Sequence, residues 1–327
     1  MPIHLLKSDP DRGSLFCFLK FTGVVDMPEW LPGWCVDHLG DRPAGVLFTL
    51  RQMSSVVGLR LAGGRAVVVK MRDDGGRVAA CVDAQTRLAD RGFPCARPLT
   101  PAVRVGPLAV HAEEYRPGGD PLPGDTPDVA VRYATVFARL MAELADLTVA
   151  PPLPNPRWVR WDHPDPGLWP AFDEVDGRDQ SAVPAYVVDT AARARRRLLA
   201  ADLPCVLGHA DFEAQNLRWR DGEVSTVHDW DSLAWMPEAA LAGAASGAFA
   251  SASPPTLAPV ESSVAFLAAY QDLRGRRFTD EEHEIAWAAS LWPAAHNARW
   301  EAVHGDPPVS GAAVRAQAAE RLRRANA

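Results

Sequence analysis

Three oxygen-bearing side chains, Asp211, Asn216 and Asp229, stand close together in one short stretch of the sequence. Between Asn216 and Asp229, two short apolar segments flank the turn signal Asp221-Gly222, which is the pattern of a β-hairpin. We expect such a hairpin to bring the three side chains into one small volume. One carboxylate there can accept a hydroxyl proton, while an amide oxygen and a second carboxylate hold Mg²⁺ on phosphate oxygens. The spacing therefore indicates phosphoryl transfer.

The local sequence resembles that of a known enzyme family. The chain reads His-Ala-Asp-x4-Asn from His209 and His-Asp-Trp from His228. The aminoglycoside phosphotransferase and choline kinase family, which has a protein-kinase-like fold, usually has His-Gly-Asp-x4-Asn and Ile-Asp-Trp or Ile-Asp-Phe at these places. The resemblance implies that Asp211 is the catalytic base and that Asn216 and Asp229 hold the metal. His209 is expected to brace the catalytic loop through hydrogen bonds.

The N-terminal part predicts three antiparallel strands, over residues 46–50, 56–61 and 66–71, the last two joined by a Gly-Gly turn. Lys70 lies at the end of the third strand, and the resemblance implies that it pairs with nucleotide phosphates. The first turn, Met53-Ser54-Ser55, contains no glycine. Ser54 and Ser55 are expected to donate hydroxyl and backbone N–H groups to phosphate.

Two further nucleotide contacts follow from the resemblance. The stretch from Glu113 through Tyr115 resembles the hinge between lobes, where backbone groups bind the adenine edge. The family also places a glutamate on the helix after the third strand, to pair with the strand lysine. The helix expected at residues 76–92 contains no glutamate, and its central acceptors are Asp83 and Gln85. Either Asp83 reaches Lys70, or Lys70 is held by the nucleotide alone.

The fold class expected from these features is α+β, with the two lobes of the protein-kinase-like fold. Residues 1–115 form a small N-terminal nucleotide-binding lobe with an antiparallel sheet, and residues 116–327 form a larger, mostly helical catalytic and acceptor-binding lobe. After the hairpin the family typically has Gly-Asp-Pro-x-x-Asp-Leu-Ala. Pro237 matches, but Met236 and Ala240 replace the two aspartates. Glu238 is the acid left in this segment, and we expect it in solvent.

Length and composition describe an ordinary globular chain with room for two lobes, because 47% of its 327 residues are hydrophobic and 23% are charged. No run of about 20 apolar residues predicts a membrane span, and the charged N-terminus does not have the pattern of a signal peptide. The five cysteines are odd in number and widely spaced. We therefore expect reduced thiols in a cytoplasmic protein.

The net charge of −7 argues against nucleic acid as a partner. Residues 201–240 hold eight acids against two arginines, an excess that would attract Mg²⁺ and a cationic acceptor. For the outlying members, Asp202, Asp221 and Glu223, a solvated acidic face is an equal alternative. The C-terminal helices offer further candidates to hold a cationic acceptor, although exposed helix charges are favoured for each of them. These candidates are Glu281, Glu282, Glu284 and Glu301.

The function expected is transfer of the γ-phosphate of ATP or GTP to a hydroxyl of a small molecule, with Mg²⁺ as cofactor. The acceptor is an aminoglycoside or other antibiotic, or, alternatively, a metabolite such as an amino alcohol, an amino acid or a sugar. The missing helix glutamate leaves a nucleotide-binding pseudokinase as a further alternative. A hydrolase that binds a transition metal through His209, Asp211, His228 and Asp229 is the remaining one, although it ignores Asn216.

Overall fold

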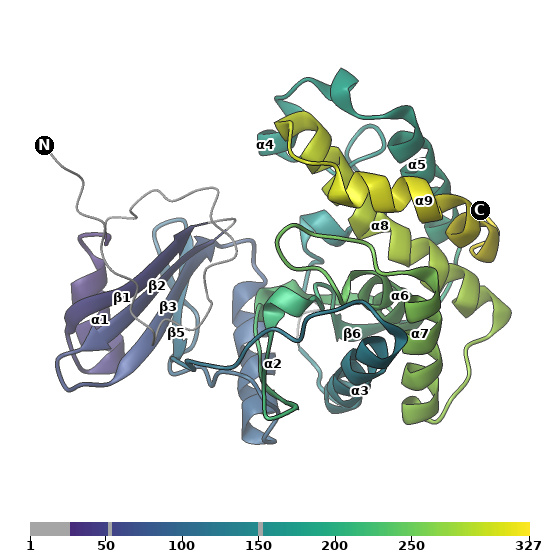
Figure 1. Cartoon of the computed structure of the whole chain (residues 1–327). Helices are drawn as coiled ribbons and strands as arrows, with labels where there is room; N and C mark the ends of the chain where they lie inside the picture. Colours follow the sequence, from purple (N-terminus) through teal and green to yellow (C-terminus); the bar gives the residue numbers. More distant parts are fainter. Residues whose placement is uncertain (1–26, 52–53, 150–152) are drawn as a thin grey trace, which may run out of the picture.

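The computed structural model describes residues 27–51, 54–149 and 153–327, and shows two lobes side by side (Figure 1). The N-terminal residues that argue against a signal peptide, Cys17, and Met53 of the expected first turn lie outside the described residues. The small lobe holds the N-terminal antiparallel sheet, and the large lobe is mostly helical.

The small lobe is built on a five-stranded antiparallel sheet in the order β1-β2-β3-β5-β4. The three expected strands are longer by one to four residues than predicted, and the helix expected at residues 76–92 is two residues shorter at each end. The helices and strands described before residue 115 follow in chain order. They are α1 (Leu31–Leu39), β1 (Pro43–Arg51), β2 (Ser55–Leu61), β3 (Ala66–Asp73), α2 (Val78–Asp90), β4 (Val103–Val105) and β5 (Leu108–Glu114).

Alternation along β3 decides which side chains reach the site. Val67, Val69 and Met71 are buried against α1, in a cluster of apolar residues specific to this lobe. Because successive side chains of a strand point to opposite faces, Lys70 and Arg72 lie on the other face, toward the large lobe. The register with β5 pairs Lys70 with His111 and Val68 with Glu113, so these polar residues share one face of the sheet.

Helix α2 and the loop after it belong to the core of the large lobe. Cys81 and Leu88 of α2, with Phe93 of the loop, are buried in the same apolar cluster as the large lobe's central helix. The Phe93 ring meets the edge of Trp230 at a centroid distance of 5.8 Å, and the N–H of Val227 donates to the carbonyl of Pro94 over 2.7 Å. Figure 1 accordingly shows α2 between the sheet and the large lobe.

The described part of the large lobe consists of helices around four short strands. The helix α3 begins at the N-cap Thr126, whose side chain accepts the N–H of Val129, and α8 begins with a capping box between Thr279 and Glu282. The helices are α3 (Pro127–Leu144), α4 (Asp173–Asp176), α5 (Ala185–Leu199), α6 (Glu238–Ala248), α7 (Val260–Arg274), α8 (Asp280–His304) and α9 (Val309–Arg324), with short 3-10 turns η1 (Arg157–Val159), η2 (Gln180–Ala182), η3 (Ala214–Asn216) and η4 (Trp230–Ser232).

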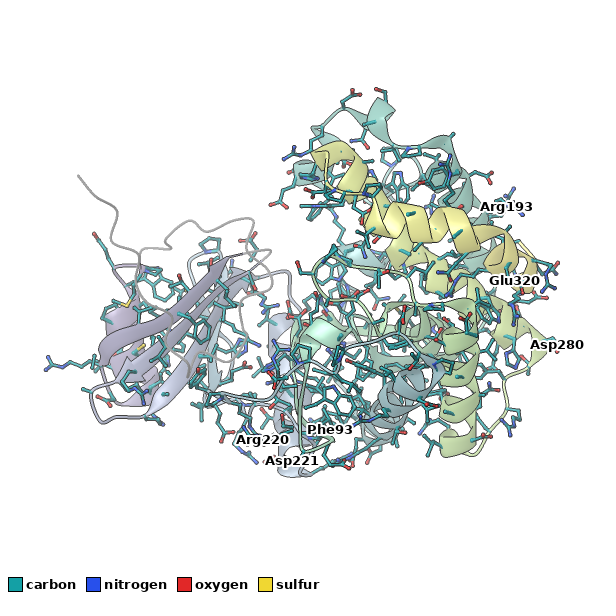
Figure 2. All side chains as sticks on the ribbon, viewed as in Figure 1. Phe93, Arg193, Arg220, Asp221, Asp280 and Glu320 are labelled. Carbon is teal, nitrogen blue, oxygen red and sulfur yellow. The ribbon has the colours of Figure 1, made fainter. Side chains whose placement is uncertain are left out.

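Two antiparallel strand pairs frame the proposed site. The strand β6 (Cys205–His209) pairs with β9 (Leu233–Pro237), and β7 (Leu217–Arg220) pairs with β8 (Glu223–Val227) in the expected hairpin. Asp221 and Gly222 both have positive φ in its turn, which is typical of a tight hairpin turn. Figure 2 shows Arg220 and Asp221 at the edge of the molecule, away from the centre of the large lobe.

The basic helix α5 is anchored rather than solvated along its whole length. Arg193 donates to the carbonyl of Ala327, near the C-terminus (Figure 2). Arg195 donates to the carbonyl of Trp161 over 2.6 Å and to that of Gly167 over 3.0 Å.

The observed fold confirms the α+β, two-lobed, protein-kinase-like fold class expected from the sequence. The small lobe contains the antiparallel sheet, and the large lobe is mostly helical. The domain limits at residues 115 and 116 stay a prediction, and α2 packs mainly with residues beyond them. Across the described ranges, the helices are too short or too polar for any of them to cross a membrane.

Candidate active site

Asp211 and Asn216 meet in the loop between β6 and β7. The amide group of Asn216 donates from Nδ2 to the backbone carbonyl of Asp211 over 2.9 Å and to its Oδ2 over 3.0 Å. The 3-10 turn Ala214–Asn216 makes this possible, because it folds the chain back within five residues. With Nδ2 committed to Asp211, the amide oxygen of Asn216 is the atom left to bind a cation.

His209 braces this loop. Its Nδ1 accepts the backbone N–H of Asp211 over 3.2 Å, and its Nε2 lies 3.0 Å from the carbonyl of His228. The two contacts require a neutral ring with its proton on Nε2. Burial lowers the pKa of His209, which agrees with that state. The ring thus ties the catalytic loop to the strand end that carries Asp229.

Asp229 lies directly after β8, at the exit of the hairpin, as expected. Its backbone adopts the left-handed conformation, with φ 63° and ψ 47°. A non-glycine residue seldom takes this conformation, and the surrounding structure must hold it there. The hydroxyl of Ser232 donates to Oδ2 of Asp229 over 3.1 Å, and the N–H of His228 donates to the carbonyl of Asn216 over 2.8 Å. These bonds fix Asp229 beside Asn216.

Three carboxylates share this volume. Burial, and then the negative charge of Asp229, raise the pKa of Asp211 to about 7. Burial and the charges of Asp211 and Asp229 also raise the pKa of Glu213 well above its usual value. Glu213 is buried, and its Oε2 accepts the side-chain N–H of Gln215 over 2.6 Å. Because like charges disfavour ionisation of their neighbours, the site has an excess of negative charge that a cation would neutralise.

Lys70 approaches the site from the small lobe. The pKa of His228 is lowered to about 4, first by the burial of its ring and then by the positive charge of Lys70. The ammonium group of Lys70 is 2.9 Å from Oε1 of Glu113. Asp83 instead pairs with Arg87 on the exposed side of α2. Both alternatives for Lys70 are therefore wrong, since it has an acidic partner and that partner is neither Asp83 nor the nucleotide.

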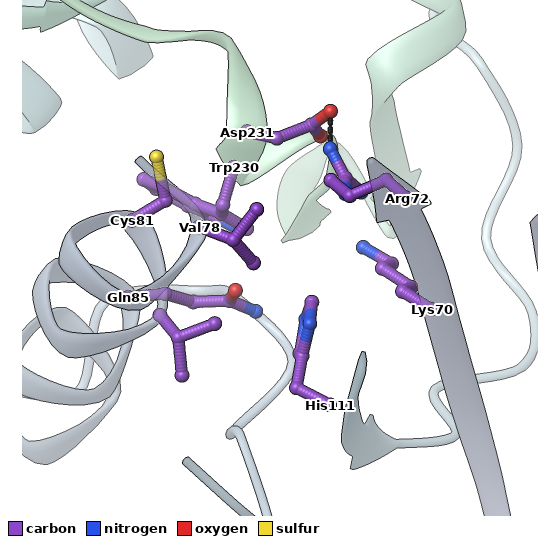
Figure 3. A pocket seen from close by; sticks show the side chains of 9 residues that line it. Lys70, Arg72, Val78, Cys81, Gln85, His111, Trp230 and Asp231 are labelled. Atoms are coloured by element: carbon purple, nitrogen blue, oxygen red, sulfur yellow. Dashed lines mark ion pairs between the residues drawn. The ribbon is translucent and has the colours of Figure 1, made fainter. Parts of the chain in front are cut away.

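Arg72, which the sequence reasoning missed, also reaches across from β3. It forms an ion pair with Asp231 of η4 (Figure 3). Asp231 of the large lobe is thereby held by an arginine of the sheet. A small cavity, lined by Lys70, Gln85 and His111 among others, lies beside the pair. The signal for Arg72 was its position two residues after Lys70, which places both cations on one face of the strand.

The remaining nucleotide-binding candidates lie at the start of β2 and at the end of β5. Ser54 is in the bend before β2, and Ser55 opens β2 opposite Met71, next to Lys70. Glu113 is on β5, but its side chain is buried against Lys70, not placed in an open hinge. Tyr115 follows β5, and its ring lies 5.9 Å from that of Phe48. The adenine contact expected of this segment stays a prediction.

Most of the acids considered as candidates to hold a cationic acceptor have partners within the fold. Glu301 is buried, and accepts the backbone N–H groups of Ser310 and Gly311 at the start of α9 over 2.7 and 2.9 Å. Glu282 caps α8 and pairs with Arg276, while Glu281 and Glu284 both contact Arg197. The favoured expectation of an exposed helix charge is confirmed for Glu281 and is wrong for the buried Glu301.

Two further expectations about acidic residues have definite outcomes. Glu238 is not in solvent, because it forms ion pairs with Arg274 and Arg276 over 3.1 and 3.0 Å. The outlying acids Asp202, Asp221 and Glu223 are exposed. The acidic excess of the sequence is therefore only partly an excess at the site.

The transition-metal alternative does not fit the local geometry. Both ring nitrogens of His209 are engaged in hydrogen bonds, so that His209 has no lone pair to offer a metal. Within the described ranges no three His, Cys, Asp or Glu side chains are arranged to hold a metal ion. An amide oxygen from Asn216 and a carboxylate from Asp229 do suit Mg²⁺, which takes one or two protein oxygens and completes its shell with phosphate and water.

Comparison with known families supports this chemistry. The model of the phosphotransferase enzyme family matches residues 53–240, which is more than half of the chain. The match includes Lys70, the catalytic loop and the hairpin. No curated protein matches the chain.

Several solved structures share the fold at low sequence identity. A microcompartment-associated aminopropanol kinase has a TM-score of 0.60 at 15% identity, over 90% of this chain and 94% of that one. The amicoumacin kinase hAmiN, in complex with AMP-PNP, Ca²⁺ and Ami, has 0.58 at 12%, over 87% and 90%. A thermostable mutant of the aminoglycoside phosphotransferase APH(4)-Ia, in a ternary complex with ADP and hygromycin B, has 0.53 at 14%, over 91% and 99%.

Proposed function

The chain belongs to the phosphotransferase enzyme family and is a small-molecule kinase, and we propose that its phosphate donor is ATP or GTP, with Mg²⁺ as cofactor. Its acceptor, on this proposal, is the hydroxyl of a small molecule that carries a positive charge. The observation that carries the proposal is the pair of hydrogen bonds, 2.9 and 3.0 Å long, that the amide of Asn216 donates to Asp211. They place the carboxylate of Asp211 beside the amide oxygen of Asn216. That pairing of a base with a metal ligand suits phosphoryl transfer.

Asp211 acts as the general base. It accepts the proton of the acceptor hydroxyl while the acceptor oxygen forms its bond to the γ-phosphorus. The bond from the γ-phosphorus to the bridging oxygen breaks at the same time, and the nucleoside diphosphate leaves with that electron pair. A pKa of about 7 places Asp211 near the pH at which a general base is most effective.

Asn216 and Asp229 hold the metal through Oδ1 and the carboxylate, and Lys70 neutralises the phosphates from the small lobe. Bound Mg²⁺ would supply charge neutralisation on the phosphate oxygens. His209 keeps the loop in place by its two hydrogen bonds. Little covalent chemistry is asked of the protein, because positioning and charge stabilisation carry most of the rate.

Ser54, Ser55, Glu113 and Tyr115 complete the proposed nucleotide site in different ways. Ser54 and Ser55 contribute hydroxyl and N–H groups to phosphate. The backbone near Tyr115 binds the base, and Glu113 acts through Lys70. The support for this grouping is that Ser55 opens β2 opposite Met71, next to Lys70, and that Glu113 forms an ion pair with Lys70.

The acceptor we favour bears an amine as well as a hydroxyl. The support is Glu213, a buried carboxylate whose pKa is raised by burial and then by its acidic neighbours, and which an ammonium group would stabilise in its charged form. The names of the structural relatives agree, since they include an aminopropanol kinase and an aminoglycoside phosphotransferase. An aminoglycoside or another antibiotic is therefore the first acceptor class to test, and resistance to it the corresponding biological role.

The pseudokinase alternative loses its main support. It depended on a strand lysine without an acidic partner, and Lys70 has one at 2.9 Å. We also propose a cytoplasmic location, because the thiols of Cys35, Cys81, Cys95 and Cys205 are free and free thiols are usual in reducing compartments.

An acceptor panel tests the proposal. The purified chain is incubated with Mg²⁺ and ATP or GTP, and release of nucleoside diphosphate is followed for aminoglycosides, amino alcohols, amino acids and sugars. Turnover that requires both Mg²⁺ and an amine-bearing alcohol is expected, and Asp211→Asn should lower kcat by roughly 10²–10⁴-fold. Near-normal turnover in that variant would remove Asp211 from its role as base.

A further inference from the structure

Glu113 of β5 forms an ion pair with Lys70 of the neighbouring strand. The distance from Nζ of Lys70 to Oε1 of Glu113 is 2.9 Å, and the two residues are 9% and 3% exposed. In the register, Glu113 stands opposite Val68, diagonal to Lys70 on the same face. A long side chain spans such a diagonal in an antiparallel pair. The ion pair therefore lies entirely within the sheet.

A second contact holds the other oxygen of Glu113. Gln85 of α2 donates from Nε2 to Oε2 of Glu113 over 3.0 Å, and to the carbonyl of Ala96 over 2.7 Å. Gln85 is 1% exposed. It lies on the helix that resembling enzymes use for the acid, but it contributes an amide instead. Glu113 is thus fixed from both sides, by an ammonium group and by an amide.

The negative charge of Glu113 persists despite its burial. Although burial would raise the pKa of Glu113, Lys70, His111 and the bond from Gln85 lower it below its usual value. His111, His228 and Arg72 also lie near the pair, and burial lowers the pKa of His111 to about 3 and that of His228 to about 4. A neutral His111 leaves Lys70 as the main cationic partner of Glu113.

From these contacts we propose that Glu113 is the positioning residue for Lys70, so that in this chain the acid has moved from the helix to the sheet. The inference rests on the proposed function, since it concerns how Lys70 is presented to nucleotide phosphates. Helix α2 is packed in the core of the large lobe. An acid on α2 would tie Lys70 to that lobe, whereas Glu113 moves together with Lys70 in the sheet. The ionic partner of Lys70 then comes from its own sheet, and α2 contributes only the neutral amide of Gln85 to Glu113.

Steady-state kinetics of three variants test the proposal. Glu113→Gln keeps the shape of the side chain and can still accept a hydrogen bond from Gln85, but removes the charge that orients Lys70. We expect it to lower kcat/KM for the nucleotide by about 10²-fold, in the range that misplacement of a catalytic group produces. In a Lys70→Gln background the same change is expected to cost less than twofold, because Glu113 acts through Lys70.

The matched control is Asp83→Asn, which removes one acid from the exposed side of α2 and should leave kcat/KM unchanged. A Glu113→Gln variant with normal kcat/KM would overturn the proposal. The proposal would also be overturned if Glu113→Gln lowered kcat/KM in the Lys70→Gln background by the same factor as in the wild type. Thermal unfolding of Lys70→Gln with and without Glu113→Gln gives a further check. Removing Glu113 should raise the melting temperature there, because it is then an unpartnered buried carboxylate, and a fall would contradict the proposal.

A readout without nucleotide separates this inference from the proposed function. Lys70 is acylated with an amine-reactive reagent, and its labelling rate is followed by mass spectrometry. Loss of the carboxylate makes a buried ammonium group give up its proton more readily, so that Glu113→Gln should accelerate labelling of Lys70 several-fold. An unchanged rate would show that Glu113 does not hold Lys70. Failure of the wild type to turn over nucleotide would instead contradict the kinase proposal and leave the labelling result standing.

Discussion

Asp211 combines a catalytic role with a cost in stability. Burial and the charge of Asp229 raise its pKa to about 7 in the folded chain, compared with about 3.9 for an unperturbed aspartate. Between these two values the folded state binds more protons than the unfolded state, so that stability falls as the pH rises. The side chain that is proposed to accept the hydroxyl proton therefore lowers the stability of the folded chain when it is ionised.

The first prediction follows from this cost in stability. Without Mg²⁺, Asp211→Asn is expected to raise the melting temperature, and to raise it more at pH 8 than at pH 5, because the ionised Asp211 is most costly above its folded pKa. The new amide can still accept the hydrogen bond from Asn216. Thermal unfolding at the two pH values measures the effect. A gain that is the same at both would contradict the raised pKa.

Glu213 gives the second prediction. Glu213→Gln is expected to raise KM for an amine-bearing acceptor about tenfold, equivalent to about 1.4 kcal/mol, because the attraction between a carboxylate and an ammonium group is lost. The affinity for nucleotide should not change. Initial rates with an amino alcohol and with an acceptor that lacks the amine make the measurement.

The control for this second prediction is Glu223→Gln, in which an exposed acid of β8 is changed. It should leave both KM values as they are. If Glu213→Gln raised KM equally for the charged and the neutral acceptor, Glu213 would be acting on the shape of the site and not on the charge of its ligand.

At the scale of elements, close contact between α6 and α8 supports the strands that carry the catalytic loop. A Cβ on Gly243 of α6 would come within 2.1 Å of the carbonyl oxygen of Ala286 in α8. The third prediction is that Gly243→Ala lowers the free energy of unfolding by about 3 kcal/mol, as overpacking of a core does. Denaturant unfolding measures it.

Gly33 provides the comparison for that element-scale prediction. It lies on the exposed side of α1, with no atom within 4 Å of a Cβ placed there. Gly33→Ala should stabilise the chain by about 0.5–1 kcal/mol, since alanine loses less backbone freedom in a helix. A similar small effect for both glycines would mean that α6 and α8 are not in close contact.

The elements were largely predictable from sequence, whereas their contacts were not. The valine run before Lys70 and the turn at Asp221 are local signals, and they gave the strands and the hairpin. The partner of Lys70 depended on which strand lies beside β3 and in which register. Asp83 was a candidate because it lies in the middle of the helix on which the resembling family places its glutamate, while Glu113 is 43 residues away from Lys70 and reaches it only through the pairing of β3 with β5.

The same limit explains the other missed residues. Glu213 and Arg72 are charged residues in segments whose strands or turns were expected, but a single sequence does not say which charges a fold buries. The glutamates of the C-terminal helices were assigned to solvent or to an acceptor for the same reason. Their actual partners, such as the N-terminus of α9 for Glu301, come from elsewhere in the chain.

At the scale of the whole molecule, the lobes are joined by charges as well as by α2. Arg72 of the sheet pairs with Asp231 of the large lobe, and Arg77, at the start of α2, donates to the carbonyl of Leu233. Burial lowers the pKa of both arginines, while the charge of Asp229 opposes the shift. These contacts hold the face of the sheet that carries Lys70 toward the catalytic loop.

The fourth prediction concerns this junction. Arg72→Met and Asp231→Asn are each expected to destabilise the chain, because either change leaves a buried charge without its partner. The double variant should be more stable than the sum of the two losses implies, by about 1–3 kcal/mol. Denaturant unfolding of the four proteins gives the coupling, and additive losses would mean that the pair contributes nothing to the junction.

The central claim is that Asp211, Asn216 and Asp229, with Lys70 across from them, form one site for a metal and a nucleoside triphosphate. Calorimetric titration of a non-hydrolysable ATP analogue, and of its GTP counterpart, into the wild type and into Asp229→Ala tests it directly. We expect the wild type to bind at least one of the two, and only when Mg²⁺ is present, and Asp229→Ala to lose that binding while remaining folded. Binding that ignores Mg²⁺, or that survives unchanged in Asp229→Ala, would contradict the claim.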